Sequence, residues 1–144
     1  MDRYETTKEE VEVMLKKLTF KRQMQIGIVL GFVIFFSCTT FPFFNFTHRI
    51  SDTIHLLNIV IAVVAFWDMG IAEAGIFHEK SVLKVLLLNT VLVLAGMGCR
   101  YLLEFGEISN TYNFTVLNSL VHIVVAATLS TLGWYNYRKR LTGE

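Results

Sequence analysis

The residues best suited to chemistry lie in one apolar segment, which runs from Ser51 to Phe77. Its length and apolar character suit a bilayer crossing, yet it contains polar and ionisable side chains, among them Asp52, His55, Asn58, Asp68 and Glu73. Ionisable groups are costly in hydrocarbon, so such a segment is expected to face protein or water rather than lipid. Asp68 and Glu73 are the leading candidates, because proton-coupled transport or an ion pathway would use a carboxyl group inside the membrane.

The depth of these two carboxyl groups separates two interpretations. If Trp67 marks the membrane interface, Asp68 and Glu73 lie at the headgroup level and are ordinary. If the helix continues to Phe77, Asp68 is immersed in the bilayer. A structural role is the alternative to transport, in which the carboxyl groups pair with Lys80, Lys84 or the basic C-terminal cluster.

On a helix, one side of this segment collects small and polar residues. At 100° per residue, this side holds His55, Asn58, Ala62, Ala65, Met69, Ala72, Glu73 and Ile76. The opposite side is bulky and suited to lipid, with Leu56, Val60, Val63, Trp67, Ile71 and Ala74. Asp68 lies at the edge of the small and polar side. The pattern therefore predicts one face toward a pathway or a partner and one face toward lipid.

A second segment, 114–135, has a similar face. The residues that share it are Thr115, Asn118, Ser119, His122, Ala126, Ser130 and Gly133. His55 precedes Trp67 by the same distance as His122 precedes Trp134, and the tripeptide Asn-Phe-Thr occurs at 45–47 and 113–115. An internal repeat would relate two hairpins by an axis along the membrane normal. The alternative is chance similarity between apolar segments.

Two histidines and two cysteines could converge in the outer half of the bundle: His55, His122, Cys38 and Cys99. Imidazole and thiolate bind zinc and copper, and a pair of histidines on facing helices can bind haem. The sequence has no ligand pair at i,i+3 or i,i+4, so the alternative is histidines that form hydrogen bonds between helices and cysteines that pack. We favour no cofactor, and geometry decides whether the cysteines form a disulfide.

Composition and charge distribution predict the class of protein. Of the 144 residues, 53% are apolar and 17% are charged, against about 25% charged in soluble domains. The charges cluster and leave long uncharged runs. We predict an all-α integral membrane protein whose four transmembrane helices form a bundle, with spans at about 25–40, 54–77, 82–103 and 114–135. Residues 1–24 are expected to include a short amphipathic helix on the membrane surface, and 138–144 a basic tail.

The basic residues predict how the chain crosses the membrane. Eleven of thirteen Lys and Arg residues precede the first span, separate the second from the third, or follow the fourth. The positive-inside rule then places both termini in the cytoplasm, and we expect a multi-pass protein of a bacterial cytoplasmic membrane. The second and third spans have a short connection and should be antiparallel neighbours.

Motifs and charge narrow the function classes. The net charge of +1 and the lack of a basic-aromatic motif give no reason to expect a nucleic-acid partner. Phosphate loops, nucleophile elbows, HExxH and CxxC are missing from the sequence, so an enzyme is not expected. The leading prediction is a non-enzymatic protein that acts through helix packing in the lipid bilayer, as a homo-oligomeric channel-like pore or a subunit of a larger membrane complex. Its packing candidates are Gly27, Gly31, Ala62, Ala65, Ala126 and Gly133.

Two other functions stay open. The first is a proton-coupled small transporter that uses Asp68 or Glu73, with Asn58, His55 and His122 as further pathway candidates. The second is a redox protein that binds haem or a metal through the histidines and cysteines. The sequence alone does not choose between them.

Overall fold

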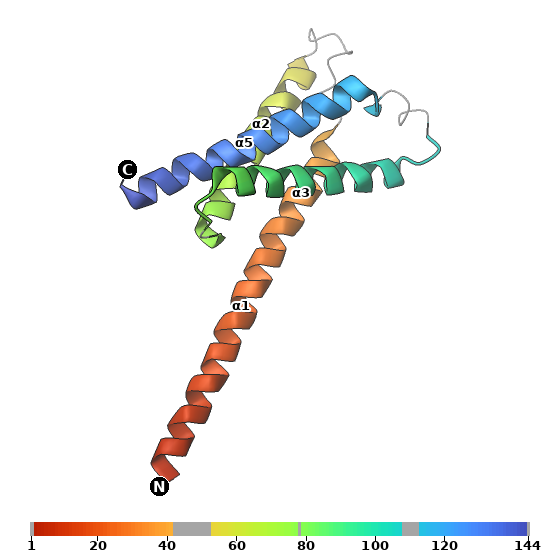
Figure 1. Cartoon of the computed structure of the whole chain (residues 1–144). Coiled ribbons are helices and arrows are strands. Elements are labelled where there is room, and N and C mark those ends of the chain that lie inside the picture. The colour runs from red at the N-terminus through yellow and green to blue at the C-terminus, as the bar shows by residue number, and fades with distance from the viewer. Residues whose placement is uncertain (1, 42–52, 78, 108–112, 144) are drawn as a thin grey trace.

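The chain is an all-helical bundle of four long helices. The computed structural model describes residues 2–41, 53–77, 79–107 and 113–143. Its helices are α1 (Asp2–Thr40), α2 (Thr53–Ile76), α3 (Val82–Leu103) and α5 (Val116–Thr142) (Figure 1). Each contains a stretch long and apolar enough to cross a membrane: Lys16–Thr40, His55–Ile76, Val82–Leu103 and Val116–Thr142. The predicted four-helix architecture is therefore confirmed, and the chain is a candidate multi-pass membrane protein in contact with lipid.

Helix α1 differs from the prediction, because its 39 residues form one element. We expected a separate short helix before a span that starts near residue 25. The candidate span instead starts at Lys16, and the N-terminal part of α1 extends beyond the other three helices (Figure 1). No glycine or proline precedes Gly27, so no residue interrupts the helical backbone there. The exposed apolar side chains of Val11, Met14 and Leu18 belong to this continuous helix.

Local capping explains the ends of α3 and α5. Ser81 caps α3, where its hydroxyl accepts the N–H of Lys84 at 3.5 Å, and Thr115 caps α5 by accepting the N–H of Asn118 at 3.2 Å. The predicted bounds of α3 are confirmed. Helix α5 is longer than expected and ends at Gly143, which has a positive φ of 72°. The basic residues 138–140 are therefore helical and belong to α5.

The helix pairs are not those that chain order suggests. The main contacts join α2 to α5 and α1 to α3, and further contacts join α3 to α5 and α1 to α2. Helices α2 and α3 are not among these main pairs, so their short connection does not make them close packing partners along their length. The bundle is a ring in the order α1, α2, α5, α3.

Glycine explains why α2 lies so close to α5. A Cβ on Gly133 would clash with the backbone carbonyl of Trp67, and one on Gly70 would clash with the carbonyl of Ser130 and come within 2.7 Å of the nitrogen of Trp134. Two helices can approach this closely only where a side chain is missing. These two glycines therefore select α5 as the partner of α2.

A third glycine makes the corresponding contact between α1 and α3. A Cβ on Gly96 would lie 2.5 Å from the Ile34 carbonyl oxygen and 2.5 Å from Cβ of Ser37. The internal repeat predicted from the sequence would relate α1 to α3 and α2 to α5 by one axis. The contact between α1 and α2 would then be equivalent to the contact between α3 and α5. The observed pairs have this pattern. The repeat stays a hypothesis, and its first tripeptide, 45–47, lies outside the described residues.

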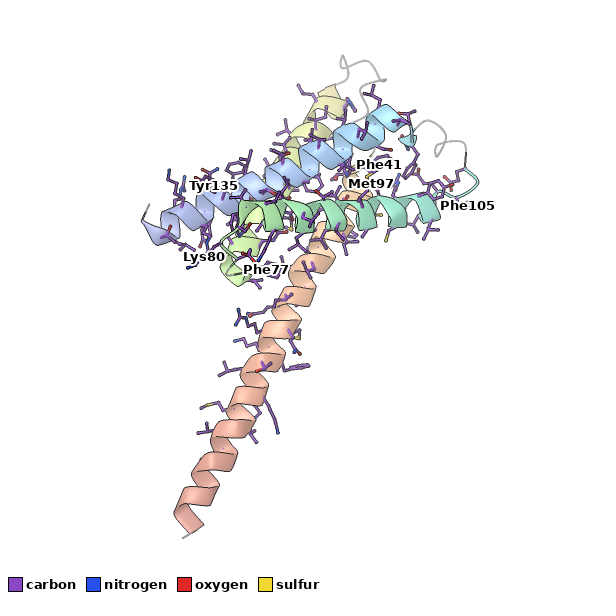
Figure 2. The ribbon with its side chains drawn as sticks, viewed as in Figure 1. Phe41, Phe77, Lys80, Met97, Phe105 and Tyr135 are labelled. Atoms are coloured by element: carbon purple, nitrogen blue, oxygen red, sulfur yellow. The ribbon has the colours of Figure 1, made fainter. Side chains whose placement is uncertain are left out.

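The apolar core occupies the centre of this ring. Its main cluster contains Phe41, Ala62, Phe66, Val93, Met97 and Ala126, and Figure 2 shows Phe41 and Met97 close together within it. A second cluster, at the end where α2 is joined to α3, contains Ala74, Val85 and Trp134. Trp134 is buried where α2, α3 and α5 meet. Tyr135, by contrast, is exposed.

Candidate functional site

The buried carboxyl group of Glu73 is the centre of the candidate site. Its side chain has 0% exposure, although it lies only one helical turn from the end of α2. The Asn89 side chain of α3 approaches the carboxyl group. Neither carboxyl oxygen has a hydrogen bond of standard geometry to any described residue. A fully enclosed carboxyl group with so little polar compensation is uncommon, because burial of a charge is costly unless it is paired.

Asn89 connects this carboxyl group to α5. Its side-chain amide donates to the Thr131 hydroxyl at 3.3 Å, and that hydroxyl donates to the Ala127 carbonyl at 2.7 Å. Asn89 has 0% exposure and Thr131 has 5%. We call Glu73, Asn89 and Thr131 the Glu73 cluster. It takes one polar side chain from each of three helices, α2, α3 and α5.

A second buried polar site lies nearer the other end of the bundle. The Ser37 hydroxyl is 3.0 Å from Nε2 of His122 and donates to the Val93 carbonyl at 3.0 Å. Because a serine hydroxyl has a single proton, this arrangement makes Nε2 of His122 the donor in their shared bond. The rings of Phe41 and Phe66 meet the imidazole edge to face, at centroid distances of 5.2 and 5.8 Å. His122 is thus a structural link between helices within an aromatic enclosure.

An apolar layer separates the two polar sites. On α3, Asn89 and Val93 are one turn apart, which corresponds to about 6 Å along the helix axis. On α5, His122 and Thr131 are separated by about 13 Å on the same basis. Phe66 and the other members of the main core cluster fill the space at this level. Apolar side chains of the main core cluster therefore lie between the Glu73 cluster and the pair formed by Ser37 and His122.

Asp68 differs from Glu73 in its surroundings. Its side chain is exposed, in the same column of α2 as the exposed residues Leu57, Ile61 and Val64. The buried column contains Ala62, Phe66, Gly70, Glu73 and Ala74. At 100° per residue, this buried column is rotated by about a quarter turn around the helix axis from the small and polar face that we predicted to be buried. The assignment of Ala74 to the lipid face is wrong, because the fit against α5 decided the rotation rather than residue polarity.

The remaining pathway candidates on α2 do not join the Glu73 cluster. His55 and Asn58 are half-buried near the opposite end of α2, and Nε2 of His55 has no hydrogen bond within the described part of the chain. Among the packing candidates, Ala62 and Ala126 are fully buried together in the main core and Ala65 is half-buried.

Two other packing candidates face outward. No described atom lies within 4 Å of the position that a Cβ on Gly27 or Gly31 would occupy. Both glycines are exposed, so their spacing serves no helix contact among the described residues. Gly133, in contrast, is essential to the contact between α2 and α5.

The structure brings Cys38 of α1 near Cys99 of α3 but does not join the cysteines and histidines into one group within the described residues. Cys38 is buried and Cys99 is exposed, and both are free thiols. Across residues 2–41, 53–77, 79–107 and 113–143, no group of three or more His, Cys, Asp and Glu side chains could hold a metal ion. His122 is buried and has the Ser37 hydroxyl as a partner, whereas His55 is half-buried near the start of α2. The haem and metal hypothesis therefore gains no geometric support.

Some residues of the buried sites were not singled out from the sequence. Ser37 and Thr131 have ordinary positions within apolar helices, and only the three-dimensional contacts show that they bind His122 and Asn89. Gly70 offered a signal, because a glycine in the middle of an apolar helix often marks a close contact. Asn89 and Thr90 are the polar residues in the interior of their apolar helix, and only the structure shows that Asn89 is the buried one of the two.

An ion pair lies at the C-terminal end of α3. Arg100 and Glu104 pair at i,i+4, as their spacing suggests, and Glu104 also accepts the Asn113 amide at 3.4 Å. Glu104 has only 7% exposure. This arrangement satisfies its own charges and leaves Glu73 as the buried carboxyl group without an ion pair in the described part of the chain.

Comparisons with known proteins give no family assignment: no family model, no curated protein and no solved structure matches the chain. The functional conclusion therefore depends on the geometry of this chain.

Proposed function

We propose that the protein is a small proton-coupled membrane transporter in which Glu73 binds and releases the coupling proton. One observation carries this proposal: Glu73 is fully buried between transmembrane helices, and neither of its carboxyl oxygens has a hydrogen bond of standard geometry to a described residue. Ionisable residues inside membrane bundles typically mark proton relays or ion pathways. A carboxyl group with a purely structural role would normally have a cation or several N–H donors beside it.

The protonated form of Glu73 suits the enclosed state of the bundle. An ionised carboxylate in such surroundings costs several kcal/mol without a partner. Asn89 offers an amide group to either form of the carboxyl group, since an amide both donates and accepts. Release of the proton would favour a second arrangement in which water or a cation reaches Glu73. A change in the contact between α2 and α5 would open such a route, because Gly70 lies one turn before Glu73.

The apolar layer above the Glu73 cluster fits this proposal. A continuous polar path would let protons leak, whereas an interrupted one requires a conformational change for each crossing. Phe66 and Val93 belong to this layer, and both have 0% exposure. We place Glu73 nearer the cytoplasmic side, on the same positive-inside argument that puts both termini there.

The decisive experiment uses purified protein in proteoliposomes that contain a pH-sensitive dye. We expect a proton flux when a membrane potential or an opposing Na⁺ or K⁺ gradient is imposed, and we expect Glu73→Gln to reduce it to the level of protein-free vesicles. Asp68→Asn is the matched control and should keep the flux, because Asp68 is exposed. Infrared spectra should contain a carboxylic acid band that Glu73→Gln removes. A flux that is the same in wild type and Glu73→Gln would refute the proposal.

A homo-oligomeric pore or a subunit of a larger complex is the second candidate function. Its specific support is the outward orientation of Gly27 and Gly31, which suits a close contact with another transmembrane helix. The small residues Ala62 of α2 and Ala126 and Gly133 of α5 no longer add to this support, because they are buried within the bundle. Crosslinking through a cysteine at position 27 in native membranes would test it, and a strictly monomeric product would count against it.

A further inference from the structure

A cationic pocket lies between the start of α3 and the last turns of α5. Its volume is about 470 Å³, and the side chains important here are Lys80, Trp134, Tyr135, Arg138 and Lys139. Figure 2 shows Lys80 and Phe77 at the turn between α2 and α3, at the same end of the molecule as Tyr135. The pocket is separate from the Glu73 cluster, and ligand binding in it does not depend on the proposed transport.

The lining of the pocket is strongly positive. Lys80, Arg138 and Lys139 contribute three cationic groups, and no acidic side chain is among the described residues that line it. Glu79 lies next to Lys80, but its Oε1 accepts the N–H groups of Lys80 and Ser81 at 2.8 and 3.1 Å and its Oε2 pairs with Lys84 at 3.6 Å. The backbone N–H groups of Ser81 and Lys80 lower the pKa of Glu79. The Glu79 carboxylate is therefore bound to the turn and to Lys84. It does not neutralise the cationic side chains that line the pocket.

Arg138 is held in position before any ligand binds. Its Nη1 donates to the Phe77 carbonyl at 3.5 Å, and its guanidinium group lies 5.8 Å from the centre of the Trp134 ring. The first contact joins α5 to the end of α2, and the second is a cation–π contact with a fully buried ring. A guanidinium group has five N–H donors, so most of them stay available for an anion. Two anchored contacts reduce the entropy that ligand binding would otherwise cost.

The position of the pocket indicates the ligand. Lys80 lies two residues before the candidate span of α3, and Arg138 and Lys139 lie in the last turns of α5. Basic pockets between transmembrane helices at this level bind anionic lipid headgroups. A planar guanidinium group with two ammonium groups matches the oxygens of a phosphate group. We propose that this pocket binds a phosphate group, which the anionic phospholipids of the surrounding membrane present at this depth.

The test measures thermal unfolding of the full-length protein in nanodiscs of phosphatidylcholine with increasing phosphatidylglycerol, and the mass of bound lipid by native mass spectrometry. The pocket variant is Lys80→Gln with Arg138→Gln. The control variant is Lys17→Gln with Arg140→Gln, which removes the same charge from two exposed residues outside the pocket lining. Inorganic phosphate added to pure phosphatidylcholine nanodiscs distinguishes a soluble phosphate ligand from a lipid ligand.

We expect phosphatidylglycerol to raise the unfolding temperature of wild type and control, and we expect the pocket variant to bind this lipid at least about tenfold more weakly, since each basic residue near an anionic surface contributes roughly 1 kcal/mol. Equal losses in the pocket and control variants would overturn the proposal, because general surface attraction would then explain the binding. A full effect of inorganic phosphate alone would keep the phosphate site and reassign its source from lipid to solution. An unfolding temperature that responds to neither ligand would also overturn the proposal.

Discussion

The Ser37 hydroxyl of α1 and the Nε2 atom of His122 in α5 lie 3.0 Å apart in the centre of the bundle. Helices α1 and α5 are opposite each other in the ring and are not among the main helix pairs. This bond therefore joins two helices across the core, and Ser37 also reaches the Val93 carbonyl of α3. One small side chain thus connects three of the four helices.

Replacement of Ser37 by alanine should destabilise the bundle. The change leaves Nε2 of His122 and the Val93 carbonyl without the hydroxyl, and loss of such a buried bond costs about 1–2 kcal/mol. Reversible unfolding in mixed micelles measures the difference in the free energy of unfolding. Thr39→Ala is the control, because the Thr39 hydroxyl donates only to carbonyls of its own helix. Equal effects of the two substitutions would contradict the structural role of Ser37.

Glycine substitutions should separate the contact between α2 and α5 from the outward face of α1. Gly133→Ala would place a Cβ against the Trp67 carbonyl, and we expect a loss of about 2 kcal/mol or more in stability, as for other overpacked sites. Gly27→Ala meets no described atom and should be neutral, or stabilising by up to about 1 kcal/mol because alanine favours helix. Thermal unfolding in detergent measures both. A harmless Gly133→Ala would mean that α2 and α5 are farther apart than the structure places them.

The two acidic residues of α2 should respond differently to a positive charge. Glu73→Lys would place an ammonium group among buried residues of three helices, which we expect to cost about 3 kcal/mol or more and to prevent folding. Asp68→Lys changes an exposed side chain and should leave the protein folded, with its purified yield and unfolding temperature close to wild type. Size-exclusion profiles and thermal unfolding report the outcome. A stable Glu73→Lys protein would contradict the burial of Glu73.

The two cysteines should differ in reactivity. Cys99 is an exposed free thiol and Cys38 a buried one, and burial raises the barrier to any reagent that must reach the sulfur. N-Ethylmaleimide applied to folded protein in detergent should label Cys99 alone, and denaturant should release the second thiol. Mass spectrometry counts the labels, and Cys99→Ser should abolish labelling of the folded protein. Rapid labelling of Cys38 in folded Cys99→Ser would contradict the close packing of α1 against α3.

Several features of the fold follow from local sequence patterns. The clustered charges and long apolar runs were enough to predict four helices, and the expected range 82–103 matches α3, where Ser81 supplies a local cap. The small and polar face of α5, with His122 and Ala126 at its centre, is its buried face. Such patterns depend on neighbours within one helix, so they can be read without knowledge of the partner helix.

Tertiary contacts decided the remaining features. The sequence alone showed that α2 contains two carboxyl groups, but only the close approach at Gly70 and Gly133 turned Glu73 inward and Asp68 outward. The same contact made α5 the partner of α2 in place of α3, its neighbour in the chain. In a bilayer, an apolar side chain has a similar free energy whether it faces lipid or protein. Hydrophobicity therefore does not specify which side of a helix is buried. Shape complementarity between helices does, and it depends on residues that are distant in the sequence.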